Sequence, residues 1–194
     1  MKTASAVLVA ALITSQAAEL VRASRQAPTA STATYESVAI DADGNLRILT
    51  SEQQTIIVPK GGFAKAGESF GKQTAFKQPV LSDDRRSVGV KAMFANCCTS
   101  YDIPLQLVIY SSGKTHRFEG DWPIVDWHLA DGGRRVAFSQ QTLHFSCLLH
   151  WELRDVASER LVETADIREN CGQIPDPPNV KVPKWVTGTV SGFE

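Results

Sequence analysis

Two segments of the chain hold residue types that could do chemistry. His144, Cys147 and His150 form a His-x-x-Cys-x-x-His pattern. Cys97 and Cys98 could complete a tetrahedral site, because thiolate sulfur and imidazole nitrogen are common zinc ligands. However, the cysteines lack a tight Cys-x-x-Cys spacing, and a three-residue step along an extended strand places side chains on opposite faces. We therefore expect no metal at these residues and no cofactor.

The same segments contain the residue types of a cysteine hydrolase, because Cys98, His144 and Asn96 could act as nucleophile, base and orienting amide. An oxidising compartment consumes free thiols, and no nucleophile motif surrounds these cysteines. Asp83 and Asp84 are paired carboxylates, but they fall in an expected hairpin turn, where capping the turn is an ordinary role. The sequence therefore predicts no catalytic residues, serine nucleophiles included.

The amino terminus has the pattern of a secretory signal. Lys2 precedes an Ala/Val/Leu/Ile run, and Ser15 and Ala17 are the small residues that a signal peptidase recognises. Cleavage after residue 17, or as late as residue 23, would leave a flexible leader up to residue 34. The apolar run is shorter than the roughly 20 residues of a membrane span. We expect an exported protein, periplasmic or extracellular, with no membrane span.

All four cysteines follow this signal, and an even number in an oxidising compartment favours disulfide bonds. A bond between the adjacent Cys97 and Cys98 would be strained. Pairing of these two with Cys147 and Cys171 is therefore our preferred hypothesis, and one bridge with two buried thiols is the alternative.

The 194 residues contain 20 Lys and Arg against 21 Asp and Glu, so no overall charge favours nucleic acid as a partner. Residues 35–168 are the length of one domain with its own core. Four prolines between residues 175 and 183 predict an extended tail over residues 169–194. Trp185 could dock this tail on a sheet face.

Short alternating runs bounded by turn residues predict an all-β domain made of antiparallel strands. In the run 125–130, Val125, Trp127 and Leu129 should lie on one face, with Trp127 between sheets. In the run 150–156, Trp151 and Leu153 should lie opposite the polar residues between them.

An internal repeat organises these strands. Residues 81–89, LSDDRRSVG, align without a gap to residues 129–137, LADGGRRVA, which lie 48 positions later. Each copy is followed by a second hairpin, over residues 107–118 and 152–163, and residues 40–59 form a fainter copy. Two hairpins supply four strands, which is the content of a propeller blade. We place the units at about 35–75, 76–122 and 123–168.

The stretches PVLSDDRRSVGV (79–90) and DWHLADGGRRVAF (126–138) resemble the Ser-Pro-Asp-Gly-x-x-Ile-Ala-Phe repeat of TolB-type, WD-like β-propellers of bacterial exported proteins. The resemblance covers about residues 35–165 and implies blade-like four-stranded units. Asp83 stands in place of the repeat's proline and Arg85 in place of its glycine. Two good units and one partial unit cannot close a ring, so we expect an open stack. An intermolecular ring and a sandwich are the alternatives.

These inferences favour an exported, non-enzymatic binding or scaffold module over an enzyme. Its partner would be a protein or peptide, and free blade edges would also permit self-association. The alternative is a metal- or thiol-dependent protein that uses the Cys/His insertions at residues 93–104 and 140–150. We expect these insertions to meet at one interaction edge, whose residues would be Tyr101, Trp122, His144 and His150.

Overall fold

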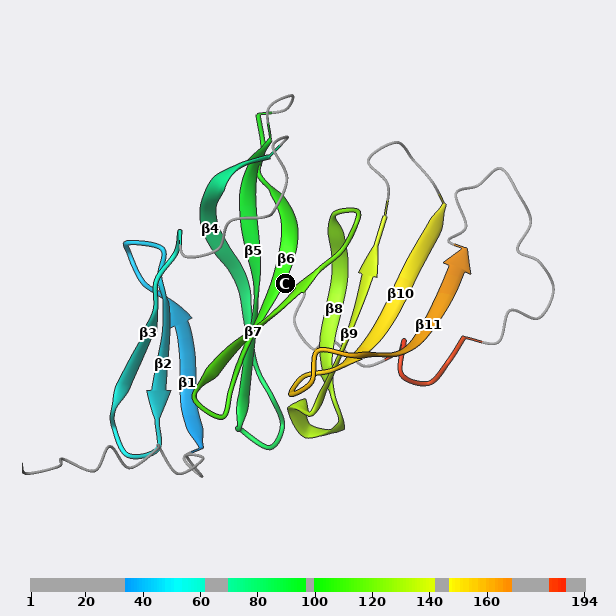
Figure 1. Cartoon of the computed structure of the whole chain (residues 1–194). Helices are drawn as coiled ribbons and strands as arrows, with labels where there is room; N and C mark the ends of the chain where they lie inside the picture. The colour runs from blue at the N-terminus through cyan, green and yellow to red at the C-terminus, as the bar shows by residue number, and fades with distance from the viewer. Residues whose placement is uncertain (1–33, 62–69, 97–99, 142–146, 169–181, 188–194) are drawn as a thin grey trace, which may run out of the picture.

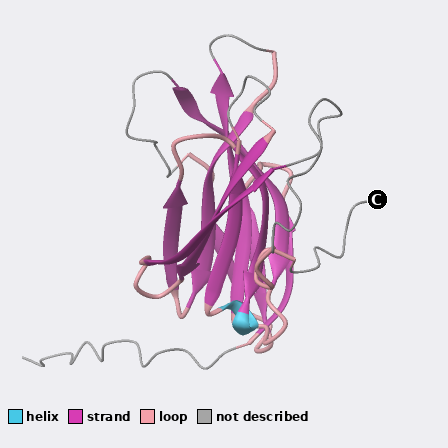
Figure 2. Ribbon diagram, turned by 90° about the vertical axis from the view of Figure 1, so that its right-hand side faces the viewer, coloured by secondary structure: helices cyan, strands magenta, loops and turns pink. Residues whose placement is uncertain are grey.

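A computed structural model describes residues 34–61, 70–96, 100–141, 147–168 and 182–187. Within these residues the protein is all-β, and its one helical element is the short 3-10 turn η1 (Asp131–Gly133) (Figures 1 and 2). The strands form three antiparallel sheets in which every strand pairs with its neighbour in the chain. The predicted fold class is confirmed.

The first sheet contains three strands and the other two contain four. Sheet 1 consists of β1 (Tyr35–Ile40), β2 (Leu46–Thr50) and β3 (Thr55–Val58). Sheet 2 consists of β4 (Phe70–Leu81), β5 (Ser87–Asn96), β6 (Ile103–Ser111) and β7 (Lys114–Glu119). Sheet 3 consists of β8 (Ile124–Ala130), β9 (Arg135–Gln140), β10 (Leu148–Asp155) and β11 (Leu161–Arg168). Strand pairing therefore assigns residues 70–75 to sheet 2, although the sequence boundary stood near residue 75.

The sheets stand side by side in an open row, as Figure 1 shows, and do not close into a ring. Sheet 2 is the central layer, and residues 87–94 of β5 are buried without exception. One apolar cluster joins sheet 1 to sheet 2 through Ile48, Val90, Phe94 and their neighbours. A second cluster joins sheet 2 to sheet 3. The preferred open arrangement is thus present.

The aligned repeat corresponds to the same hairpin in sheets 2 and 3. Leu81 pairs with Val88 across the β4–β5 hairpin, and Leu129 pairs with Val136 across the β8–β9 hairpin. Both pairs keep the 48-residue offset. We call the end formed by the turns of residues 82–86, 111–114, 131–134 and 155–160 the turn end. The opposite end, where β5 and β9 finish and β6 and β10 begin, is the insertion end.

Trp127 anchors sheet 3 against sheet 2. Its side chain is buried, and a Cβ built on Gly89 would lie only 2.4 Å from the indole ring. Nearby, the buried Lys91 donates a hydrogen bond of 2.6 Å from Nζ to the Val125 carbonyl. Burial lowers the pKa of Lys91, and the neighbouring Asp126 carboxylate opposes that effect. Trp127 therefore lies between sheets, as the alternation predicted.

The alternation predicted for residues 125–130 is wrong at Val125, which does not share the buried face of Trp127. The pairing of β8 with β9 is irregular between Ile124 and Trp127. An irregularity of this kind shifts the side-chain alternation. As a result, Ile124 joins the core with Trp127, whereas Val125 is 44% exposed.

The outer face of sheet 3 is covered by part of the tail. Trp185 and Val186 pack on an apolar cluster that contains Leu149, Trp151 and Leu153. The His128 ring donates from Nε2 to the Trp185 carbonyl at 2.8 Å and lies 5.9 Å from the Trp151 ring. Residues 183–187 form two overlapping turns. Trp185 thus docks on a sheet face as expected.

A search of the described residues finds no helix long and apolar enough to span a membrane.

The two glycines of the second repeat copy bring sheet 3 close to sheet 2 at the turn end. Gly132 and Gly133 have φ angles of 66° and 87°, a region that costs other L residues about 1–2 kcal/mol. A Cβ on Gly133 would also lie 2.8 Å from the side chains of Ser82 and Ser87. The Ser87 hydroxyl donates to the Gly133 carbonyl at 3.2 Å. Gly133 therefore makes a close contact between sheets in addition to turning the chain.

Gly133→Ala should destabilise the fold by about 2–4 kcal/mol, because backbone strain adds to overpacking against sheet 2. Gly61→Ala is the matched control, since Gly61 has a φ of 85° but no atom of the described residues lies within 4 Å of the place that an added Cβ would take. That control should lose about 1–2 kcal/mol. Urea unfolding measures both values, and equal losses would contradict an inter-sheet role for Gly133.

Attachment of the tail should depend on the protonation of His128. Burial lowers the pKa of this ring below its ordinary value of 6.5, against smaller opposing effects of the Trp185 carbonyl and Asp126. A depressed histidine pKa means that the folded state favours the neutral ring, so this contribution to stability is complete above pH 6.5 and decreases as the pH falls. Protonation would also place a proton on Nδ1, which is buried and has no hydrogen-bond partner among the described residues.

Between pH 7.5 and 5.5, the wild-type protein should therefore lose more unfolding free energy than His128→Gln, which has no titrating ring at this position. Chemical unfolding at a series of pH values measures the difference. Parallel pH profiles for the two proteins would rule out this role for His128.

Candidate functional site

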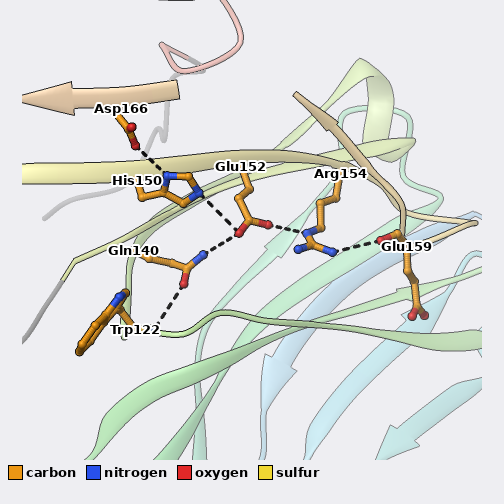
Figure 3. Close-up of polar contacts among 7 residues, drawn as sticks. All are labelled: Trp122, Gln140, His150, Glu152, Arg154, Glu159 and Asp166. Carbon is orange, nitrogen blue, oxygen red and sulfur yellow. Dashed lines mark hydrogen bonds and ion pairs between the residues drawn. The ribbon is translucent and has the colours of Figure 1, made fainter. Parts of the chain in front are cut away.

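The structure brings together two of the four residues of the predicted interaction edge. Trp122 lies in the link between β7 and β8, and His150 lies on β10; both flank the buried Gln140 and Glu152 (Figure 3). Tyr101 lies just before β6 in sheet 2 and is 62% exposed. His144 lies outside the described residues.

The cysteine pairing predicted from the sequence stays a prediction. Cys147, which directly precedes β10, is disulfide-bonded. Cys97, Cys98 and Cys171 lie outside the described residues.

Glu152 is the centre of a polar network on the face of sheet 3 that is turned toward sheet 2. One of its carboxylate oxygens accepts a hydrogen bond from the Gln140 side-chain amide at 3.0 Å. The other oxygen accepts from Arg154 Nε at 2.5 Å. His150 Nε2 lies 3.8 Å from the first oxygen. Because Glu152 and Gln140 are both buried, these contacts satisfy polar atoms that water reaches poorly.

The network holds the backbone of Trp122 in place. The backbone N–H of Trp122 donates to the Gln140 side-chain oxygen at 3.2 Å, while the Gln140 nitrogen donates to Glu152. Figure 3 shows the indole directed away from these polar groups. The Trp122 side chain is 47% exposed. An exposed aromatic ring is therefore attached to backbone that the buried Gln140 and Glu152 hold in place.

Two further carboxylates extend the network toward both ends of the sheet. At the insertion end, the His150 ring contacts Asp166 on β11, with 2.7 Å between Nδ1 and Oδ1. Toward the turn end, Arg154 Nη1 approaches the Glu159 carbonyl at 3.4 Å, and the Glu159 carboxylate lies 3.2 Å from His116 Nδ1 on β7. The last contact joins sheet 3 to sheet 2.

The network surrounds the His150 ring with acidic groups. Both ring nitrogens of His150 face carboxylates, those of Asp166 and Glu152, and neither partner is the nucleophile that an acyl-transfer site requires. Within the described residues no group of three or more His, Cys, Asp or Glu is arranged to hold a metal ion.

One serine motif was missed in the prediction of catalytic residues. Gly67, Ser69 and Gly71 form a Gly-x-Ser-x-Gly pattern. A nucleophile elbow places this pattern between a strand and a helix. Here strand β4 begins at Phe70, so the pattern leads into a strand instead. Ser69 lies outside the described residues, and no role is assigned to it.

Exposed apolar side chains gather at the insertion end. Of the large hydrophobic residues that are exposed in the described chain, half lie close to the beginning of β6, β8 or β10, which share this end: Tyr101, Trp122, Val125 and Leu148. Their exposed fractions range from 43% to 62%. Apolar side chains concentrated at one end of a molecule are typical of an interaction surface.

Sequence reasoning found Trp122 and His150 but not the network between them. The signal was present in the alternation of β10, where His150, Glu152 and Arg154 share one face. A polar face on a strand ordinarily points to solvent. In this protein it points toward a second sheet.

Neither the protein-family models nor the curated proteins searched contain a match to this chain.

Glu152→Ala should destabilise the protein by about 2–3 kcal/mol, because it leaves the buried Gln140 side-chain amide and Arg154 Nε without their acceptor. Glu163→Ala on the exposed edge strand β11 should change stability by no more than about 0.5 kcal/mol. Thermal or urea unfolding provides both values. A loss at Glu152 no larger than that at Glu163 would contradict the central place of this carboxylate.

Proposed function

We propose that this protein is an exported, non-enzymatic binding module built from propeller-type β-repeats, and that its insertion end is the interaction edge. Three features support the proposal: the secretory pattern at the amino terminus, the resemblance of residues 79–90 and 126–138 to TolB-type repeats, and the open row of sheets. The observation that carries it is Trp122, an exposed indole fixed on the buried Gln140–Glu152 pair.

The chemistry of this edge fits a protein or peptide partner. Aromatic residues are enriched at protein interfaces, because they bury a large area and lose little conformational entropy. At the same end of the sheets the exposed Val125 and Leu148 add apolar area. Beside the half-exposed His150, the exposed Asp166 carboxylate supplies a hydrogen-bonding group at the rim. Such an edge would bind a partner with an apolar centre and a polar border.

A disulfide between Cys147 and Cys97 or Cys98 would strengthen the edge. These cysteines belong to the links that join the second and third strands of sheets 2 and 3. A bridge between the two links would tie the sheets together, with a typical contribution of about 2–4 kcal/mol. It would also leave these thiols unable to act as nucleophiles.

Site-specific photo-cross-linking tests the interaction edge. A photoreactive phenylalanine analogue at position 101 of the exported full-length chain should give a discrete cross-linked product in its host. The same analogue at Ile57, an exposed residue of sheet 1, should not. Trp122→Asp should reduce the product at position 101 by about fivefold or more, as expected for loss of a central aromatic contact.

Leu161→Asp, at an exposed position on β11, is the matched control and should leave the yield unchanged. A product of the mass of two chains would identify the partner as a second copy. Absence of a discrete product at position 101, or equal products at positions 101 and 57, would contradict the proposed edge.

A further inference from the structure

A groove lies between sheets 2 and 3 at the turn end, opposite the proposed interaction edge. Its volume is about 730 Å³, which falls within the usual range for small-ligand sites. Four turns form its walls: those of residues 84–87 and 111–114 from sheet 2, and those of residues 132–134 and 155–157 from sheet 3. His116 on β7 completes the lining.

Hydrogen bonds within and between the two sheets hold the floor of this groove in place. The buried hydroxyl of Ser87 lies 3.1 Å from the Ser111 hydroxyl and 3.2 Å from the Gly133 carbonyl. The backbone N–H of Val156 donates to the Arg134 carbonyl at 2.9 Å, which fixes the two turns of sheet 3 to each other. The groove is therefore preformed by the packing of the sheets.

Three cationic side chains from three of these turns line the groove: Arg86, Lys114 and Arg134. All three residues are exposed. In the part of the chain that the structure describes, the side chains of Arg86 and Lys114 make no hydrogen bond or ion pair. Arg134 uses only Nε, which donates to the Asp131 carbonyl at 3.1 Å. The charged ends of these side chains are therefore available to a ligand.

The acidic residues of the groove are already engaged within their own turns. Asp84 Oδ1 accepts from the Ser82 hydroxyl at 2.7 Å and from the Arg86 backbone N–H at 2.9 Å. Asp155 Oδ1 accepts from the hydroxyl and backbone N–H of Ser158, and these bonds lower the pKa of Asp155. Capping of the turns accounts for both carboxylates, whereas no contact within the described part of the fold uses the charged groups of Arg86 or Lys114.

We propose that this groove is a second binding site, and that it takes a ligand bearing a carboxylate or phosphate group held by Arg86, Lys114 and Arg134. Guanidinium groups bind these planar or tetrahedral anions through paired hydrogen bonds, and an ammonium adds a point charge. The hydroxyl of the exposed Ser112 offers a further donor at the rim. The site does not depend on the proposed interaction edge at the opposite end.

Isothermal titration calorimetry on the full-length exported protein at low ionic strength tests the site. The probes are hexaglutamate, pyrophosphate and the neutral hexaglutamine. At least one anion should bind with a Kd below about 1 mM, and its identity distinguishes a carboxylate source from a phosphate source. Hexaglutamine should not bind. Added salt should weaken the interaction, because exposed charges are screened.

Variants locate the bound anion. Arg86→Gln and Lys114→Gln should each weaken binding by about tenfold, the loss expected for one charge-assisted hydrogen bond. Ala157→Trp should block the groove without removing any charge, because Ala157 is an exposed lining residue. Lys77→Gln on the exposed surface of β4 removes the same charge away from the groove and should have no effect.

Three outcomes would overturn the second site. The first is that neither anion binds with a Kd below about 1 mM. The second is that Lys77→Gln and Lys114→Gln weaken anion binding equally. The third is that Ala157→Trp leaves the Kd of the anion unchanged. Since all the substituted residues are exposed, an unchanged unfolding midpoint should accompany each variant and exclude loss of the fold as the cause.

Discussion

The fit of the Trp127 indole over Gly89 sets the separation of sheets 2 and 3. Any side chain larger than hydrogen at position 89 would meet the ring at 2.4 Å, and the sheets would have to move apart. Phe118 and Phe138 pack beside this contact with their ring centroids 6.4 Å apart. The polar network at one end and the groove at the other both require the same separation, so one close approach supports both surfaces.

The number and order of the hairpins in sheets 2 and 3 could be predicted from the sequence because their signals are local. Turn residues and alternation mark each strand, and the 48-residue offset relates two hairpins that prove to share a register. The exposure of Val125 could not be predicted in this way. It follows from the irregular pairing of β8 with β9, at which Lys91 of another sheet binds the Val125 carbonyl. A contact between sheets cannot be recognised from a local sequence pattern.

In the candidate site, too, local sequence indicated some residues and not those that depend on contacts between sheets. Trp122 could be picked out because Gly120 and Pro123 disfavour a regular buried strand around it. Glu152 could not, since a charged residue on an alternating strand has the same signature whether it faces water or a second sheet. Arg86 and Arg134 could not be assigned to one site from the sequence, because they belong to separate turns 48 positions apart. Their shared groove becomes visible only when two turns that are distant in sequence stand side by side.

The docked tail gives the row of sheets a boundary. An uncovered apolar sheet face could pack against a sheet of another molecule, as sheets 1 and 2 pack against each other. Repeated packing of this kind would add molecules without limit. Trp185 and Val186 cover this face of sheet 3. They belong to a short segment, residues 182–187, that contains no strand. A few residues of turn thereby cover the outer face of sheet 3 with a segment of the same chain.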